Sequence, residues 1–418
     1  MSPFDPTIDT NFREYADLQL RRHGLLMSGR EQGPEFDQIE DRMTELWEKF
    51  DAAQRQSENG MGSDLNWIRR KGQPPPKGRK AEEVTPSERQ ELLAARMLNE
   101  WHGFLHYMRI CASTIPAVNL AYLRGNAYDA IGFPTYAITF YELAAELDPT
   151  NPAIGVIALR AVDRVDPEKA LRRAGQVIAS PFQFPPVVVA MSAVMVLRRD
   201  EEGGHPMERD RYTAVLNETV RRLSIEPPSD SGQAMTYQLA ASGFEILGDL
   251  TAALRFYEEG LKISPDNEVL LIGKGLLLYG SQTETAVEAF RRVVSNEGSP
   301  LVWPYFFLAH HYLLRQNYSE SLKMGKQARA RATTNPVRAE LFQWQAICLS
   351  ESGYPPGVVR PLFEKALSLD PSNERIRKNS EAYKESLADE RDTHWDIEAE
   401  ETLRTERAPR MSELELAA

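Results

Sequence analysis

Two histidines at helical spacing come nearest, in this sequence, to residues that could bind a metal. His102 and His106 stand four apart in the string EWHGFLHYM, so a helix would place both imidazoles on one face. The glutamate of an HExxH site is missing between them, and no third ligand follows at a familiar spacing. The adjacent His310 and His311 would point in different directions on a helix and could not both face one ion. We interpret these histidines as packing, surface or groove residues and expect no metal site and no cofactor.

Motifs for nucleotide binding and nucleophilic catalysis are missing from the chain. The sequence contains no G-x-x-x-x-G-K-[ST] loop, no G-x-G-x-x-G after a strand and no G-x-S-x-G elbow. Paired carboxylates such as Glu201 and Glu202 fall in polar stretches, where no apolar pocket would raise a pKa for acid–base work. Cys111 and Cys348 follow or lie within apolar stretches, which is typical of small buried residues. We predict that the protein is not an enzyme.

Composition is that of a folded protein without a membrane anchor. Of 418 residues, 42% are hydrophobic and 26% are charged, which supplies enough apolar surface for a sizeable core. Two cysteines argue against a disulfide framework and fit a reducing compartment. The amino terminus is acidic and mixed in polarity, and the longest apolar run, residues 187–197, is shorter than the roughly 20 residues that a bilayer helix needs. We expect a cytoplasmic protein with no membrane partner.

Negative charge is concentrated at the carboxyl terminus. The formal net charge is −12, and residues 381–418 alone hold twelve acidic and five basic residues. A nearly neutral body lacks the clustered cations on which duplex nucleic-acid binding depends, so we do not expect a nucleic-acid partner. One basic cluster could still touch RNA or an acidic protein surface, or could dock on the chain's own acidic tail. Its members are Arg69, Arg70, Lys71, Lys77, Arg79 and Lys80.

The amino-terminal region divides into helical stretches and a linker. Apolar residues recur at three- and four-residue spacing over residues 35–56, so we expect residues 1–56 to form a helical segment. Residues 57–84 are rich in Gly, Pro and basic residues, which predicts a linker. Thr85, Pro86 and Glu88 form the pattern of a helix start, so we expect a lead-in region over residues 85–116 with one long helix at about 87–110.

Downstream of this region, one pattern recurs with matching columns. The stretch 119–151 combines small and aromatic residues in a helix-turn-helix arrangement, and further copies begin near residues 234, 268, 302 and 339. The shared columns include Gly125, Tyr128, Gly132, Ala137, Tyr141 and Pro149 in the first copy, Phe244, Gly248, Ala253, Tyr257 and Pro265 in the second, Gly275, Ala286 and Phe290 in the third, Tyr305, Ala309 and Ala328 in the fourth, and Ala346, Gly353, Phe363, Ala366 and Pro371 in the fifth. This pattern resembles the tetratricopeptide repeat, a unit of about 34 residues.

The resemblance implies an all-α fold. We expect a tetratricopeptide-type helical-repeat solenoid, a superhelix of antiparallel helix pairs, over residues 117–373. It should contain about seven units, and the units within residues 152–231 should be irregular. Residues 374–388 should form a capping helix with a polar outer face, because an open solenoid end needs one. Residues 389–418 are expected to form an acidic disordered tail, in which scattered apolar residues could still be a short binding motif.

The resemblance also implies a function and a site. Repeats of this family act as binding scaffolds, and the first helices of successive units line a groove for a peptide or partner helix. We therefore predict a non-enzymatic scaffold or adaptor for a protein or peptide partner. The side chains at positions 303, 306, 307 and 310 are a surplus over those needed to fill the core, and such a surplus on one face indicates an interaction surface. Some of them could instead fill the packing between repeats. The predicted groove residues are Tyr122, Asn126, Gln238, Leu239, Ile272, Trp303, Phe306, Phe307, His310 and Trp344. The alternative is a regulatory or accessory subunit of an enzyme or ribonucleoprotein complex, which makes contact through the amino-terminal helices and the basic linker.

Overall fold

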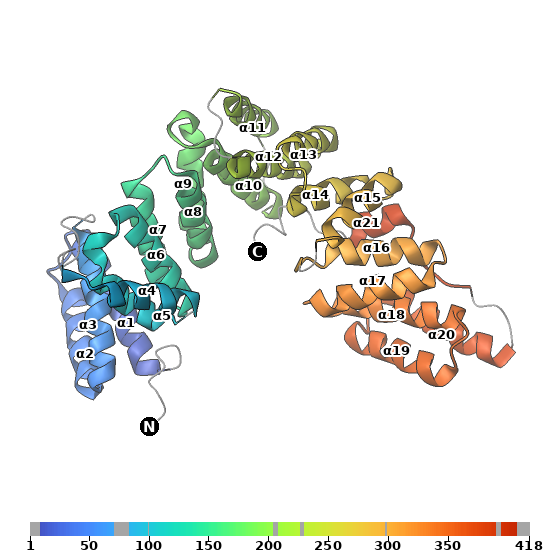
Figure 1. Cartoon of the computed structure of the whole chain (residues 1–418), viewed down its shortest axis with the longest axis horizontal. Coiled ribbons are helices and arrows are strands. Elements are labelled where there is room, and N and C mark those ends of the chain that lie inside the picture. Colours follow the sequence, from blue (N-terminus) through green and yellow to red (C-terminus); the bar gives the residue numbers. More distant parts are fainter. Residues whose placement is uncertain are drawn as a thin grey trace. The chain divides into compact units, whose positions relative to one another are not determined.

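The chain folds into helices throughout its described part (Figure 1). The computed structural model describes residues 9–70, 83–98, 100–203, 208–225, 230–296, 299–389 and 394–407. Within these ranges every regular element is a helix and no strand occurs, which confirms the all-α prediction. None of the helices in the described ranges is long and apolar enough to cross a membrane.

Two compact units divide the chain, residues 1–196 and residues 197–418. The first unit contains α1 (Thr10–Met27), α2 (Pro34–Lys49), α3 (Ala52–Arg69), α4 (Pro86–Met97), α5 (Trp101–Ile110), α6 (Ala117–Ala130), α7 (Pro134–Leu147), α8 (Pro152–Val165) and α9 (Pro167–Ala179). Helix α10 (Pro186–Glu202) runs across the boundary between the units.

The second unit continues with α11 (Arg209–Leu223) and a series of adjacent helix pairs. These are α12 (Asp230–Ile246) with α13 (Leu250–Ile263), α14 (Glu268–Leu278) with α15 (Thr283–Val294), α16 (Trp303–Leu314) with α17 (Tyr318–Arg331), and α18 (Asn335–Glu351) with α19 (Pro356–Leu369). Helices α20 (Glu374–Asp389) and α21 (Glu400–Arg407) follow.

In two pairs, α6 with α7 and α14 with α15, the helices cross where a glycine meets an aromatic ring. A Cβ atom added to Gly125 of α6 would lie 2.5 Å from the Tyr141 ring of α7, and one added to Gly275 of α14 would lie 2.4 Å from Phe290 of α15. The turn between α12 and α13 uses Gly248, whose φ of +78° is accessible to glycine at little cost. Asp249 then caps α13, because its carboxylate accepts a hydrogen bond from the Ala252 amide.

Two features of the amino-terminal region differ from the expected boundaries. Helix α3 extends to Arg69, whereas a linker was predicted from residue 57, because Met61, Leu65 and Trp67 are buried and stabilise the helix through packing. Helices α4 and α5 occupy residues 86–110 as two helices that pack against each other, rather than as the single helix predicted at 87–110. Residues 71–82, which hold most of the predicted basic cluster, lie outside the described residues.

Candidate functional site

Five of the predicted groove residues gather in the second unit as a cluster of rings. The ring centroids of Phe306 and Trp344 are 4.6 Å apart, those of Trp303 and Phe306 are 5.5 Å apart, and those of His310 and Trp344 are 5.2 Å apart. Phe307 is 0% exposed and belongs to the core, because its ring stacks on Phe290 of α15 at 5.6 Å. The cluster is therefore largely covered, with only Trp303 half-buried.

The other predicted groove residues occupy two kinds of position. In the second unit Gln238, Leu239 and Ile272 are buried. In the first unit Tyr122 and Asn126 are half-buried, and the Tyr141 hydroxyl donates a hydrogen bond of 2.7 Å to Asn126 Oδ1.

Residues 394–407 cover part of this cluster. The segment follows α20, and its helix α21 lies against α14 to α16 (Figure 1). This placement corrects the expectation of a disordered tail for residues 394–407, because Leu403 is 0% exposed and Trp395 packs on other rings. Residues 390–393 and 408–418 lie outside the described part of the chain.

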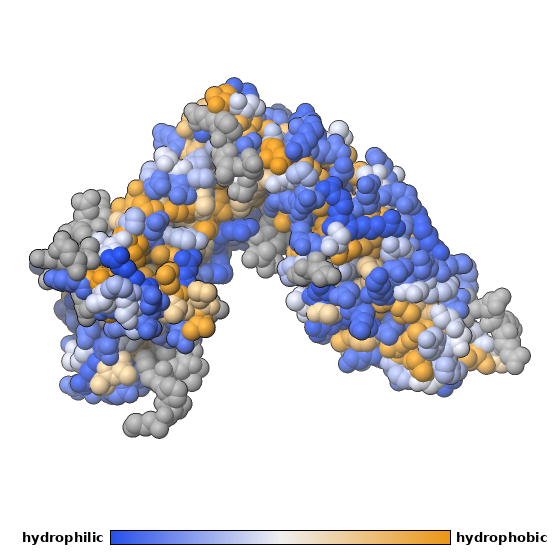
Figure 2. Space-filling model, in the orientation of Figure 1, coloured by the Kyte–Doolittle hydropathy of each residue, from blue (hydrophilic) through white to orange (hydrophobic). Residues whose placement is uncertain are grey.

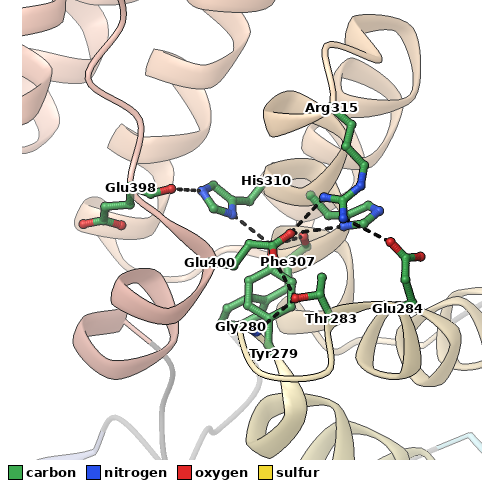
Figure 3. A network of polar contacts seen from close by, with 10 residues as sticks. Tyr279, Gly280, Thr283, Glu284, Phe307, His310, Arg315, Glu398 and Glu400 are labelled. Atoms are coloured by element: carbon green, nitrogen blue, oxygen red, sulfur yellow. Dashed lines mark hydrogen bonds and ion pairs between the residues drawn. The ribbon is translucent and has the colours of Figure 1, made fainter.

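Two buried side chains hold the backbone of the segment. Asn379 of α20, which is 1% exposed, donates from Nδ2 to the carbonyl of Asp396 at 2.9 Å and accepts from the Asp396 amide at 2.7 Å. His310 Nε2 lies 3.0 Å from the carbonyl oxygen of Glu398 (Figure 3). Both contacts are made to main-chain atoms, those of Asp396 and Glu398, which are two residues apart. Sites that bind an extended peptide make contacts of this kind.

The hydrogen bonds of His310 define its tautomer. A carbonyl oxygen only accepts hydrogen bonds, so Nε2 carries the proton and donates to Glu398. Nδ1 therefore accepts, and the Tyr279 hydroxyl lies 2.9 Å from it. Burial lowers the pKa of His310 to about 4, so the ring is neutral at pH 7.

Acidic side chains of the segment face arginines. Glu398 forms an ion pair with Arg375 of α20. Glu400, at the start of α21, accepts a hydrogen bond of 2.5 Å from Thr283 and forms an ion pair of 3.0 Å with Arg315 (Figure 3). Burial alone would raise the pKa of Glu400, but the hydrogen bonds from Thr283 and Arg315 outweigh burial and hold this pKa below its ordinary value of 4.5.

Apolar contacts fix both ends of the segment. The Trp395 ring stacks on Phe363 of α19 and lies near Tyr383 of α20, with centroid distances of 6.0 and 6.4 Å. At the other end Gly280 approaches the backbone of α21 so closely that an added Cβ would lie 2.6 Å from the Cα of Glu401. In the view of Figure 2 hydrophilic residues cover most of the visible face of α14 to α17, which agrees with burial of their aromatic side chains.

Sequence reasoning missed Asn379, Arg375 and Arg315. Asn379 and Arg375 fall in the stretch expected to be a capping helix, and Arg315 follows the aromatic helix α16. For Arg375 and Asn379 the signal in the sequence is that a basic residue and an amide stand four apart, at helical spacing. The acidic tail was identified as a candidate binding motif, but its partner surface was not.

The paired histidines of the first unit lie beside a cavity. His102 and His106 are exposed residues of α5, and with Arg109 and Tyr128 they line a cavity of about 390 Å³. Among the described residues no group of three or more His, Cys, Asp or Glu side chains is placed to hold a metal ion. In the described part of the chain, His102 and His106 are therefore not joined by a third His, Cys, Asp or Glu side chain placed to bind the same ion.

A buried charge network stabilises the contact between α3 and its neighbours. Asp64 of α3 accepts hydrogen bonds from Arg109 Nη2 at 2.9 Å and from the Tyr128 hydroxyl at 2.8 Å, and it lies 3.0 Å from Arg124 Nη2. The Arg124 guanidinium also lies over the Trp67 ring, 4.9 Å from its centroid. Arg124 contributes to this network through its ion pair and its ring contact, since its guanidinium nitrogens have no hydrogen-bond partner among the described residues.

Adjacent helix pairs that follow one another along the chain define a class of fold, the tetratricopeptide-type helical repeat, and this chain has that fold. No protein-family model matches the chain, and no curated protein matches it. Among solved structures it is similar to the Cut9–Hcn1 hetero-tetramer of the APC/C, with 12% identity, a TM-score of 0.29, and coverage of 88% of this chain and 82% of that one. It is also similar to the P58(IPK) TPR domain, with 15% identity, a TM-score of 0.22, and coverage of 81% and 80%.

Proposed function

We propose that this chain is a protein–protein interaction scaffold that binds a linear segment of a partner protein on one face of its second unit. The binding face comprises α14, α16, α18, α20 and the residues directly after α14 and α16. The observation that carries this proposal is the pair of hydrogen bonds between Asn379 and the backbone of Asp396. The function proposed is binding, with no catalytic step.

Recognition of the backbone suits a binding surface. A side-chain amide that pairs with both the N–H and the C=O of one residue fixes an extended chain without regard to the side chain of that residue. His310 adds one further backbone hydrogen bond two residues along, from Nε2 to the carbonyl oxygen of Glu398. A peptide from another protein could satisfy the same donors and acceptors, and neighbouring side chains would then select its sequence.

The aromatic cluster has a supporting role in this proposal. Trp344 packs beside His310, Phe306 packs on Trp344, and the imidazole is buried from water. A hydrogen bond in such a dry environment is electrostatically stronger than one in water. We therefore assign peptide contact to His310, Asn379 and the arginines, and assign most of the aromatic rings to packing.

Selection of binders from a displayed peptide library tests the proposal. The bait is the full chain with Leu403→Asp, which places a charge where a leucine is fully buried and so loosens the bound segment. We expect selected peptides to bind at least about tenfold more weakly when Asn379→Ala is added, because two hydrogen bonds are lost. Lys378→Ala, at the neighbouring exposed position, is the control and should leave binding unchanged.

A second variant separates binding from folding. Asn379→Asp keeps the size of the side chain and its acceptor oxygen but cannot donate to a peptide carbonyl. It should weaken binding while the circular dichroism melting curve stays close to that of the bait. Peptides that bind with equal affinity to the bait and to both Asn379 variants would contradict the proposed face.

A further inference from the structure

We infer that residues 394–407 are an intramolecular competitor for this face, and that the partner supplies an acidic peptide of the same chemistry. The inference depends on the proposed function and adds to it the type of ligand and its regulation. In the sequence HWDIEAEETLRTER, the pattern is an aromatic residue, two glutamates and a leucine, at positions 395, 398, 400 and 403.

The two glutamates define the charge of the ligand. Glu398 and Glu400 are two residues apart, and they meet two different cations, Arg375 and Arg315. Thr283 adds a hydroxyl donor beside Arg315. Carboxylates that accept charge-assisted hydrogen bonds are bound more strongly than neutral acceptors, so this face selects an acidic segment.

The apolar contacts define the ends of the ligand. Trp395 lies against the rings of Phe363 and Tyr383, and Leu403 is fully buried. Between them Gly280 leaves room for backbone, since any larger residue there would meet the main chain of Glu401. A ligand therefore needs an aromatic side chain before the glutamates and an aliphatic one after them, with a helical turn that presents the aliphatic side chain.

Competition follows from the geometry of the contacts. Asn379 offers one donor–acceptor pair to a backbone, and His310 offers one Nε2 proton, so the face cannot hold two segments at once. Only residues 390–393 separate the end of α20 from the described segment. Attachment through so short a connection gives a high effective concentration, on the order of millimolar, against which a partner must compete.

The test uses a fluorescent synthetic peptide of residues 394–407 and the full-length chain. The wild-type chain should bind this peptide at least about tenfold more weakly than the Leu403→Asp chain, whose own segment is loosened. Leu387→Asp is the matched control, because Leu387 lies on α20 but is exposed, and it should bind the peptide as weakly as the wild type does. If Leu403→Asp lowers the melting temperature strongly, Glu400→Arg provides a second loosened chain, since it sets a cation against Arg315.

Charge recognition is tested with the peptide rather than with the protein. A peptide in which Glu398 and Glu400 are both replaced by Gln should bind the loosened chain at least about tenfold more weakly than the unsubstituted peptide, because both ion pairs are lost. Equal binding of the charged and neutral peptides would overturn the acidic specificity.

The remaining outcomes separate the inference from the proposed function. Equal binding of the peptide by the wild-type and loosened chains would overturn the competition, while leaving the face as a binding site. Library peptides that bind the loosened chain through Asn379 while the 394–407 peptide does not would overturn the inferred ligand chemistry alone. Failure of both kinds of peptide to bind any loosened chain would overturn the inference together with the proposed function.

Discussion

Substitution of Glu58 by glutamine should change how the stability of the first unit depends on pH. Glu58 lies on α3, is 1% exposed, and neither of its carboxyl oxygens has a hydrogen-bond partner among the described residues. Burial raises the pKa of this carboxyl group from 4.5 to about 8. The folded chain therefore holds Glu58 protonated at neutral pH.

The sign of the effect follows from proton binding. Between pH 4.5 and pH 8 the folded state binds a proton at Glu58 that the unfolded state releases, so the free energy of unfolding falls as pH rises through this range. The stabilising contribution of the neutral carboxyl is complete below pH 4.5. A pKa difference of this size corresponds to at most about 5 kcal/mol at pH 8.

Urea unfolding followed by circular dichroism at pH 5 and pH 8 measures this effect. The Glu58→Gln side chain has the same shape and stays neutral, so its free energy of unfolding should exceed that of the wild type by about 2–5 kcal/mol at pH 8 and match it within about 1 kcal/mol at pH 5. Glu48→Gln, on the exposed side of α2, is the control and should change stability by less than about 0.5 kcal/mol at either pH. Parallel pH profiles for the wild type and Glu58→Gln would refute the reasoning.

Three further predictions concern packing and buried charge. Phe307→Ala should lower the free energy of unfolding of the second unit by about 3–5 kcal/mol through cavity formation, and a loss below about 1 kcal/mol in urea unfolding would mean that the ring is not core. Asp64→Asn should cost about 3–5 kcal/mol in the first unit, because it removes the charge facing the fully buried Arg124; an unchanged urea midpoint would rule out this role. Gly125→Ala should cost about 1–3 kcal/mol through overpacking against Tyr141, and a melting temperature equal to that of the wild type would contradict the close crossing of α6 and α7.

The repeat fold could be predicted because its determinants are local. Gly125 and Tyr141, or Gly275 and Phe290, recur within one unit at a fixed spacing, and each pair fixes how two adjacent helices cross. Helix α3 was missed because it contains Gly60, Gly62 and Ser63, which have low helix propensity. Tertiary burial of its apolar side overrides that preference, and the sequence window does not contain the helices that provide the burial.

The binding face could be predicted only in part, for a related reason. His310 and Trp344 were identified from the expected register of first helices, but Asn379 and the docked segment were not. The hydrogen bond of His310 joins residues 88 positions apart, and that of Thr283 with Glu400 joins residues 117 positions apart. Composition alone makes an acidic stretch resemble a disordered one, because an acidic segment is stable only where cations and apolar surface are already placed for it.

The position of His310 connects the packing of the second unit to its proposed function. The rings of Trp344 and Tyr279 lie beside the buried imidazole, with Phe306 packed on Trp344. Burial keeps the imidazole neutral, and a neutral ring has one N–H to donate. Because the Glu398 carbonyl oxygen of the bound segment can only accept, that proton lies on Nε2, and Nδ1 is left to accept from the Tyr279 hydroxyl. The aromatic cluster contacts little of the peptide itself. It can still determine peptide binding, because it keeps His310 neutral and holds in place the Nε2–H group that donates to the peptide.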